Sequence, residues 1–561
     1  MNIQHITPQI QQNKEQNKQL KHQSFTGGFE VTSSVLRFLD TNQAWGANAV
    51  DLCSMVIPRT TVDFVNRGPE AGTETARRES MGTFNHSMVG VYGTAAGLAL
   101  ATMFNKKYGI RADKIFANDQ TVDILAKYWA EARKTSDDPK VYVKNYTDKI
   151  ADNIKFFNTS AETESGYVKL SHDAKEEFSK ALSEKLLNSD SKTIEKDFRK
   201  YIHSLLSSDT GAETKVVLEG NNIKADNSLK ALIGNVYNVS KTFLEKGVDN
   251  VFKANGAENK FVKGLKALNL RRSVLGLGIA TTIGMLTQPV NMYLTKKKTG
   301  KDGFVGVPGR EKDNSANFKI LKTISFLGFA LGALSTITTN PKKLLNKIQF
   351  QGMTPTISQL KLVYGLTIAS RLLAARDKDE LRESAVKDSL GFLNLLVLGS
   401  LVTKGVARAF DKSLINVTKE NSQSFFKWLT NSSLKTRDEV LYSALKTQGI
   451  KTVKDGKAIP FKELVKLADK ETKGKLRILN LAQIAGYLYS GIVLGVGVPK
   501  LNIYMTNKSE AKRKAKLAAK GINIEENKEA SNNDNKAANN ENQYKNMIRP
   551  ENLAFLSQNM K

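Results

Sequence analysis

The sequence predicts an all-α, multi-pass helical membrane protein with four to six spans, a helical soluble insertion and disordered termini. Three observations predict this class. Long apolar stretches recur along the 561-residue chain, clusters of Lys and Arg border them, and a long polar region with helical periodicity separates the first stretch from the second. A helix rises about 1.5 Å per residue, so about 20 apolar residues cross the ~30 Å hydrocarbon core of a bilayer.

Four stretches are long enough, or nearly so, to span a membrane. Three contain no Asp, Glu, Lys, Arg or His, and the fourth contains only Lys322, near its first turn, where a Lys side chain can reach the interface. We expect all four to be transmembrane helices. In chain order they are Ser87–Phe104, Ser273–Leu294, Ile320–Thr339 and Ile478–Val498.

Two weaker stretches, Leu360–Ala375 and Ser389–Thr403, would raise the number of spans to six. The first contains Lys361 and Arg371, and an Arg at the bilayer centre costs about 2.5 to 3.5 kcal/mol. We therefore expect that stretch to tilt, to lie in the interface or to pack against protein. An even number of spans would place both termini on one side. Basic residues border both ends of nearly every stretch, so the positive-inside rule gives no orientation.

The alternative fold is a large soluble helical bundle. The mean hydropathy is only −0.35, and a helix buried on all sides is also apolar throughout. However, soluble core helices rarely run for about 20 residues without a charge. They also rarely end in basic runs such as Lys296–Lys298 and Lys512–Lys514. These two features favour the membrane protein.

The N-terminal part divides into two regions. Residues 1–27 are polar and rich in Gln and Asn, which predicts a disordered segment. Residues 28–104 should contain amphipathic or interfacial helices followed by the first span. Within them, Ala47–Ile57 is apolar but contains Asp51 and is too short to span, so it predicts an interfacial or re-entrant segment.

Residues 105–272 predict a soluble helical domain. Segments such as Asp113–Lys134 place apolar side chains on one helical face and charged side chains on the other. Residues 273–410 follow as membrane helices, with two strong and two weaker spans. The Gly- and Lys-rich segment of residues 295–319 lacks the spacing of a phosphate-binding loop, so we interpret it as a connecting loop.

The C-terminal part contains the last strong span. Residues 411–477 predict a polar helical connection, in which the Asp-Gly pair of Thr452–Ile459 indicates a small hairpin. The last span lies within residues 478–506. Residues 507–561 are basic and rich in Asn, and we expect a disordered tail.

The net charge of +29 is distributed unevenly. Residues 1–104 balance at about zero and residues 105–272 sum to about +6, which leaves about +23 for residues 273–561. The excess therefore surrounds the apolar stretches, which favours a lipid bilayer with an anionic leaflet as a partner. Aromatic residues, which stack on bases, make up only 8% of the chain. Nucleic acid is therefore disfavoured as a partner, and a soluble basic nucleic-acid-binding protein is the second alternative.

Few residues point to chemistry. The first 25 residues have no apolar core, so we expect no cleavable signal peptide. The single cysteine, Cys53, excludes an internal disulfide and a Cys-based zinc cage. The five histidines are scattered, and we find no catalytic, metal or cofactor motif. We therefore expect a protein that is not an enzyme and binds no cofactor.

The densest group of charged residues precedes the first apolar stretch. Glu74 and Arg78 stand one helical turn apart and can pair, and His86 lies at the mouth of the span, where an imidazole can titrate near neutral pH. We expect a solvated or interfacial ion-pair network, with a proton relay or substrate-binding cluster as the alternative. The group comprises Arg59, Asp63, Arg67, Glu70, Glu74, Arg77, Arg78, Glu79 and His86.

Small residues recur at four-residue spacing inside the apolar stretches. Such pairs let helices approach closely, either within the chain or between copies of it in a homo-oligomer. The pairs are Gly93 with Gly97, Ala280 with Gly284, Gly328 with Gly332, and Gly491 with Gly495.

Taken together, these features favour a non-catalytic membrane scaffold or interaction protein that binds a protein partner or a second copy of itself. The first alternative is a transport or pore-forming membrane protein, in which Pro289, Gln288 and Asn291 would line a pathway. The strong stretches contain no Asp, Glu or His that could couple ion movement, which weakens the transport interpretation.

Overall fold

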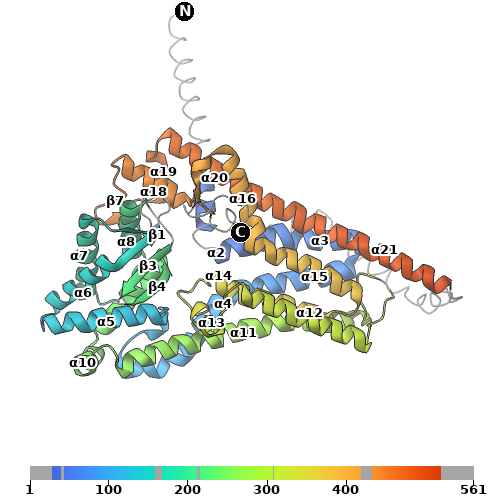
Figure 1. The fold of residues 1–561 in the computed structure, drawn as a ribbon, viewed down its shortest axis with the longest axis horizontal. Helices are drawn as coiled ribbons and strands as arrows, with labels where there is room; N and C mark the ends of the chain where they lie inside the picture. The colour runs from blue at the N-terminus through green and yellow to red at the C-terminus, as the bar shows by residue number, and fades with distance from the viewer. Residues whose placement is uncertain are drawn as a thin grey trace, which may run out of the picture. The chain divides into compact units, whose positions relative to one another are not determined.

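The computed structural model describes most of the chain, and helices dominate it (Figure 1). This confirms the predicted all-α class. Residues 1–499 form one compact unit and residues 500–561 a second. The segments predicted to be disordered, residues 1–27 and 507–561, lie outside the described residues except for 507–519. The described ranges are 28–39, 43–157, 167–211, 215–220, 222–307, 309–417 and 432–519.

Five helices of the described chain are long and apolar enough, by length and composition, to cross a membrane. Four hold all or most of the strong stretches, and the fifth holds the weaker stretch Ser389–Thr403. The other weaker stretch forms most of α14 (Ile357–Ala374), which is not among the five. The five are α4 (Pro69–Tyr108); α11 (Lys260–Thr299); α12 (Ala316–Ser335); α15 (Lys378–Leu393) continued by η4 (Asn394–Leu398) and α16 (Gly399–Phe410); and α20 (Lys470–Tyr489) continued by η6 (Ser490–Gly497) and α21 (Val498–Ala518).

Local sequence signals set the length of the two longest regular helices, α4 and α11. Helix α4 begins with Pro69, whose missing N–H costs nothing in the first turn. Helix α11 begins after Asn259, whose side chain accepts a hydrogen bond from a backbone N–H in the first turn. Both helices end at a glycine in the left-handed conformation, Gly109 (φ 66°) and Gly300 (φ 71°), as is common for helix C-termini.

Helices α4 and α11 pack against each other in antiparallel orientation. Near the middle of the contact, a Cβ added to Gly276 would lie 2.7 Å from the Cα of Gly93. Further along, the Arg77 guanidinium donates a hydrogen bond to the Asn291 side chain over 2.8 Å. The residue number therefore falls along α4 as it rises along α11, and small residues permit the close approach.

The long helices run between two ends of a bundle. At the loop end, Arg376 contacts Glu74 and Lys301 lies 3.5 Å from Glu70. At the other end, which we call the domain end, the helices lead into smaller folded regions. Helices α4, α12 and α15–α16 run from the loop end to the domain end, and α11, α14 and α20–η6 run back. The short helix α13 (Pro341–Lys347) connects α12 to α14 at the domain end.

The region of residues 109–259 forms a domain that contains a sheet as well as helices. Its strands form a four-stranded antiparallel sheet in the order β2-β1-β3-β4, which the sequence analysis did not predict. Strands this short give little alternating signal between long helical patterns. The elements are η3 (Ala112–Lys114), α5 (Asp119–Thr135), α6 (Pro139–Asn153), β1 (Ile154–Phe157), β2 (Tyr167–Lys169), α7 (His172–Asn188), α8 (Lys196–Thr210), β3 (Lys215–Gly220), β4 (Ile223–Ser228), α9 (Leu229–Phe243) and α10 (Lys246–Asn255).

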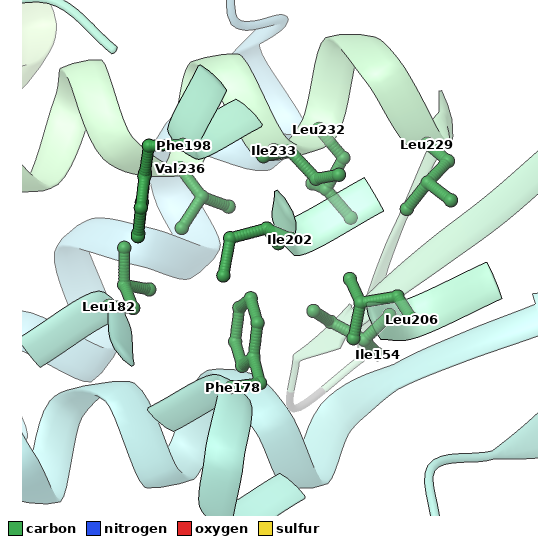
Figure 2. A pocket seen from close by; sticks show the side chains of 10 residues that line it. All are labelled: Ile154, Phe178, Leu182, Phe198, Ile202, Leu206, Leu229, Leu232, Ile233 and Val236. Atoms are coloured by element: carbon green, nitrogen blue, oxygen red, sulfur yellow. The ribbon is translucent and has the colours of Figure 1, made fainter. Parts of the chain in front are cut away.

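The core of this domain is apolar and surrounds the fully buried Trp129. Figure 2 shows a small pocket within it, between α7, α8, α9 and β1, with Phe178, Ile202 and Leu232 in its lining. All of the lining side chains are hydrocarbon. The pocket offers no group for catalysis or metal binding, so we assign it to the core.

Residues 411–469 form a second small region at the domain end. The predicted hairpin is confirmed, because β7 pairs with β8 across Asp455 (φ 50°) and Gly456 (φ 68°), the positive φ angles that a type I′ turn requires. The elements are η5 (Lys412–Leu414), β5 (Ile415–Val417), β6 (Ser432–Leu434), α18 (Arg437–Thr447), β7 (Val453–Lys454), β8 (Lys457–Ala458) and α19 (Phe461–Leu467).

The N-terminal helices link the two ends of the bundle. Residues 28–39 are helical, and Ser33 accepts a hydrogen bond from Asn480 over 2.8 Å in the middle of α20. The segment Ala47–Ile57, predicted to be interfacial or re-entrant, lies inside one continuous helix. That helix comprises α2 (Gln43–Val50), η2 (Asp51–Val56) and α3 (Ile57–Arg67).

The second unit is described by its helical part. Helix α21 continues through residues 500–518, where Glu510 and Arg513 form an ion pair of 2.7 Å. The first twelve residues of the predicted tail, 507–518, are therefore helical.

Candidate functional site

Charged side chains gather inside the bundle, toward its loop end. They come from α3, α4, α14 and α15, segments that lie up to about 330 residues apart in the chain. Two glycines make room for them. A Cβ on Gly82 would lie 3.0 Å from the Arg371 guanidinium, and one on Gly391 would lie 3.6 Å from that of Arg59. We call the deepest group the inner cluster, which comprises Arg59, Arg78, Glu79, Arg371, Lys387 and Asp388.

Glu79 stands at the centre of the inner cluster, where four cations converge on its carboxylate. The Lys387 ammonium lies 2.9 Å away, and the guanidinium groups of Arg78, Arg371 and Arg59 lie at 3.2, 3.4 and 3.7 Å. None of these five side chains is more than 9% exposed. Glu79 on α4 therefore contacts cations from α3, α14 and α15 as well as from its own helix.

Arg371 extends the cluster to a second carboxylate. It lies 3.3 Å from Asp388 and also donates a hydrogen bond to the backbone carbonyl of Arg78. The Nε of Arg371 and the Oδ2 of Asp388 are buried without a hydrogen-bond partner. Buried polar atoms are nearly always satisfied, so these two leave unused bonding capacity in the interior.

An outer cluster lies between the inner cluster and the loop end. Arg376 contacts Glu74 and lies 2.9 Å from Glu380, while Arg310 binds Asp377 at 3.2 Å and Asp379 at 2.6 Å. Both clusters contain cations and carboxylates. The outer cluster comprises Arg67, Glu74, Arg310, Arg376, Asp377, Asp379, Glu380 and Glu383.

Three π-helical turns in the described chain, η2, η4 and η6, lie beside the inner cluster. Each begins with a polar residue: Asp51, Asn394 or Ser490. Asp51 accepts a hydrogen bond from Thr83, and the Asn394 amide donates to the Ser490 hydroxyl over 3.1 Å. Such wide turns occur frequently at functional sites.

The structure separates the predicted charged residues into several environments. Arg59, Arg78 and Glu79 belong to the inner cluster, and Glu74 and Arg67 to the outer one. The expected Glu74–Arg78 pair does not form, because Glu74 binds Arg376 and Arg78 binds Glu79. Sequence spacing alone cannot show such competition from α14 and α15.

The remaining predicted members lie around these clusters. Asp63 accepts a hydrogen bond from Thr75 over 2.6 Å and lies 3.5 Å from Arg67, and Arg77 donates to Asn291. Glu70 is 47% exposed, and the other members of the group are buried or half-buried. His86 is buried, with its ring 4.9 Å from that of Tyr364 and its Nε2 without a hydrogen-bond partner. Most of the group therefore lies in the protein interior. The solvated form of the expected network is wrong, and the interfacial form stays a prediction.

Sequence reasoning missed Lys387, Asp388, Arg376 and Glu380 as members of the site. The sequence does contain a signal for them: all four lie between the two weaker apolar stretches, and Arg371 lies within the first of these stretches. Charges that weaken a candidate span are the ones that a bundle must pair internally.

The predicted helix-packing residues lie in different environments. Added Cβ atoms at Gly93, Gly97, Gly284 and Gly495 would all come within 3 Å of atoms from other segments. The pair Gly328 and Gly332 on α12 has nothing within 4 Å of an added Cβ. Ala280 is fully buried, and Gly491 approaches Ser54 at ordinary contact distance.

Within the described residues, no group of three or more His, Cys, Asp or Glu side chains is placed to hold a metal ion. Comparison with known proteins gave no match to any family model, curated protein or solved structure.

Proposed function

We propose that this chain is an integral, multi-pass membrane protein that moves a small ion or polar solute through its helix bundle. The single observation that supports this proposal is the inner cluster, a group of paired charges buried between helices that are apolar on their outer faces. Ionisable residues inside membrane bundles are rare and usually belong to a pathway or a proton relay.

The depth of the cluster supports the proposal. Arg77 hydrogen bonds to Asn291, which lies inside the apolar stretch Ser273–Leu294 of α11. Arg78 and Glu79 are the next residues of α4, so they lie beside that stretch and not beyond its end. If α11 crosses the membrane, the inner cluster lies within the thickness that its apolar residues cover.

The outer faces of the helices suit contact with lipid. Helix α12 is the least buried candidate span, and Ile324 and Leu331 expose 62% and 66% of their surface. An apolar exterior around a charged interior is the arrangement expected of a bundle in a bilayer.

Stability alone gives no reason for such a cluster. Replacing buried ion pairs by apolar side chains is often neutral or stabilising, so a network this large needs another role. The strong stretches contain no Asp, Glu or His, which disfavours transport. However, α4 carries Glu79 and His86 into the bundle beside the apolar stretch of α11, so ionisable groups are present there.

Two experiments test the proposal in order. First, membranes washed at alkaline pH should retain the chain, whereas release into the wash would contradict membrane insertion. Second, the purified chain should be reconstituted into liposomes and assayed for flux of protons, sodium and chloride. The three ions are needed because both clusters contain both signs of charge.

Glu79→Gln and Glu70→Gln form a matched pair for the flux assay. Glu79 is 6% exposed and contacts four cations, whereas Glu70 is 47% exposed and contacts Lys301. We expect the first substitution to remove most of the flux and the second to leave it unchanged. Equal flux in empty and protein-containing liposomes would contradict transport.

A membrane scaffold is the second candidate, and one observation favours it. Gly328 and Gly332 lie open on α12, beside the exposed Leu327 and Leu331, so another helix could approach this face closely. A scaffold of this kind should show no flux and should associate through α12. Gly332→Leu should then reduce cross-linking between copies in the membrane, with Gly278→Leu on the exposed face of α11 as the control.

A further inference from the structure

We infer that the helix of residues 43–67 crosses the membrane as an additional span, which makes the number of passages odd. The inference rests on the proposed membrane insertion but not on transport. It concerns a lipid-contacting surface on a segment that is not one of the five candidate spans.

The length of the segment fits a crossing. The elements α2, η2 and α3 follow one another without a break from Gln43 to Arg67. At about 1.5 Å per residue they cover about 35 Å, somewhat more than the ~30 Å hydrocarbon core. The segment escapes a search by hydropathy because it contains four charged residues: Asp51, Arg59, Asp63 and Arg67.

All four charged residues have partners inside the protein. Asp51 accepts from Thr83, Arg59 lies 3.7 Å from Glu79, Asp63 accepts from Thr75, and Arg67 donates to Glu383 over 2.9 Å. These contacts lie on the face that packs against α4 and α15. The charges therefore face the bundle, as charged residues inside a membrane must.

The opposite face is apolar and exposed. Its large side chains are exposed by about half or more, and they extend along most of the segment: Leu52 (45% exposed), Ile57 (56%), Phe64 (42%) and Val65 (78%).

Even the polar residues on this face are satisfied locally. Thr61, well inside the segment, donates to the carbonyl of Ile57 over 3.0 Å, and Asn66, at the loop end where the segment leaves the hydrocarbon, donates to that of Val62 over 2.7 Å. A helix that satisfies its own polar side chains in this way can face hydrocarbon.

The two ends of the segment lie at opposite ends of the bundle. Residues 28–39, which precede it, contact the domain end through Arg37, which pairs with Asp438 and lies over the ring of Phe461 at 4.5 Å. At the other end, Arg67 lies over the ring of Phe304 at 5.4 Å, in the loop between α11 and α12.

An additional span changes the number of times that the chain passes through the bundle. The five candidate spans, α14 and the segment of residues 43–67 make an odd number of passages. The last of them, α20–η6, runs from the domain end toward the loop end, and Leu494 accepts a hydrogen bond from Arg59 of the inner cluster over 3.3 Å. The first and the last passage therefore run in the same direction. An even number of spans would have made them run in opposite directions.

Cysteine accessibility tests the inference directly, because the chain has one cysteine to remove. In a Cys53→Ser background, single substitutions Thr32→Cys and Asn66→Cys mark the two ends of the segment. Lys457→Cys and Lys301→Cys serve as references for the domain end and the loop end. All four positions are exposed. Sealed vesicles are treated with a membrane-impermeant maleimide before and after permeabilisation.

We expect T32C to label from the same side as K457C, and N66C from the same side as K301C. Labelling of T32C and N66C from one side, with the references on opposite sides, would overturn the inference. Labelling of K457C and K301C from the same side would contradict both the inference and the assignment of the long helices as membrane passages. If all four label fully in sealed vesicles, the membrane proposal itself fails.

A second measurement covers the case in which a labelled end variant does not fold. Ile57→Cys carries a fluorescent bimane at the middle of the exposed face, and K457C carries the same dye as a water-exposed control. Brominated lipid should quench I57C, and aqueous iodide should quench K457C. Quenching of I57C by iodide alone would overturn the inference, because this face would then contact water.

Discussion

Gly93 of α4 and Gly276 of α11 bring two helix backbones into direct contact. A Cβ on Gly276 would lie 2.7 Å from the Cα and 2.9 Å from the backbone nitrogen of Gly93. Between the two helices, Phe350 covers the same glycines with its ring. Since backbone atoms cannot move aside as a flexible side chain can, this contact sets the distance between α4 and α11 and thereby the position of Glu79.

Gly276→Ala should destabilise the bundle. The added methyl group would overlap the backbone of α4, and overpacking of this kind costs about 1 to 3 kcal/mol. Gly278→Ala is the matched control, because Gly278 lies two residues away on the exposed face with nothing within 4 Å. It should leave the stability unchanged or raise it by at most about 1 kcal/mol through helix propensity. Thermal unfolding in detergent measures both, and equal transition temperatures would contradict a close backbone contact.

Arg376→Met should be strongly destabilising. Arg376 is 2% exposed and binds both Glu74 and Glu380, so its loss leaves two buried carboxylates without a cation. Breaking a buried pair in this way costs about 3 to 5 kcal/mol. Adding Glu74→Gln and Glu380→Gln should recover much of the loss, because the neutral amides no longer need a cation. Lys378→Met, at an exposed position two residues away, should change the stability by about 0.5 kcal/mol or less. Failure of the triple variant to recover would show that Arg376 acts by packing alone.

Stability should fall as the pH falls from about 6.5 to about 4. Burial lowers the pKa of His203 in α8 to about 4, with repulsion from Arg37 and Lys230 in the same direction and Asp438 opposing. In this pH range the unfolded chain binds more protons at this site than the folded chain, so acid favours unfolding. The stabilisation is fully present above the unfolded pKa of about 6.5.

The His203→Gln variant should lose this part of the pH dependence. We expect a difference of about 1 to 2 kcal/mol between the ends of the range, below the full 1.36 kcal/mol per pKa unit because the imidazole is partly exposed. Unfolding measured in detergent at a series of pH values gives the slope. His172→Gln, at an exposed position, should retain the wild-type slope. A wild-type slope in the His203 variant would assign the effect to other groups.

The inner cluster shows which residues of the site the sequence could predict and which it could not. Charge density before the first apolar stretch indicated Arg59, Arg78 and Glu79, because local concentration is visible in a linear chain. Arg371 and Lys387 are about 300 residues further on, and spacing along one helix gives no information about partners on another. The pairing of Glu79 with Lys387 at 2.9 Å depends on how α4 meets α15.

The sequence by itself determined the helical class, the long apolar helices and the Asp455–Gly456 hairpin. Each depends on local terms: apolar runs, caps, and glycines that accept positive φ. Only the tertiary structure decided which charges are buried, that residues 43–67 form one continuous helix with its charges turned inward, and that Gly93 faces Gly276. These outcomes depend on contacts between helices distant in sequence, whose free energies no local pattern contains.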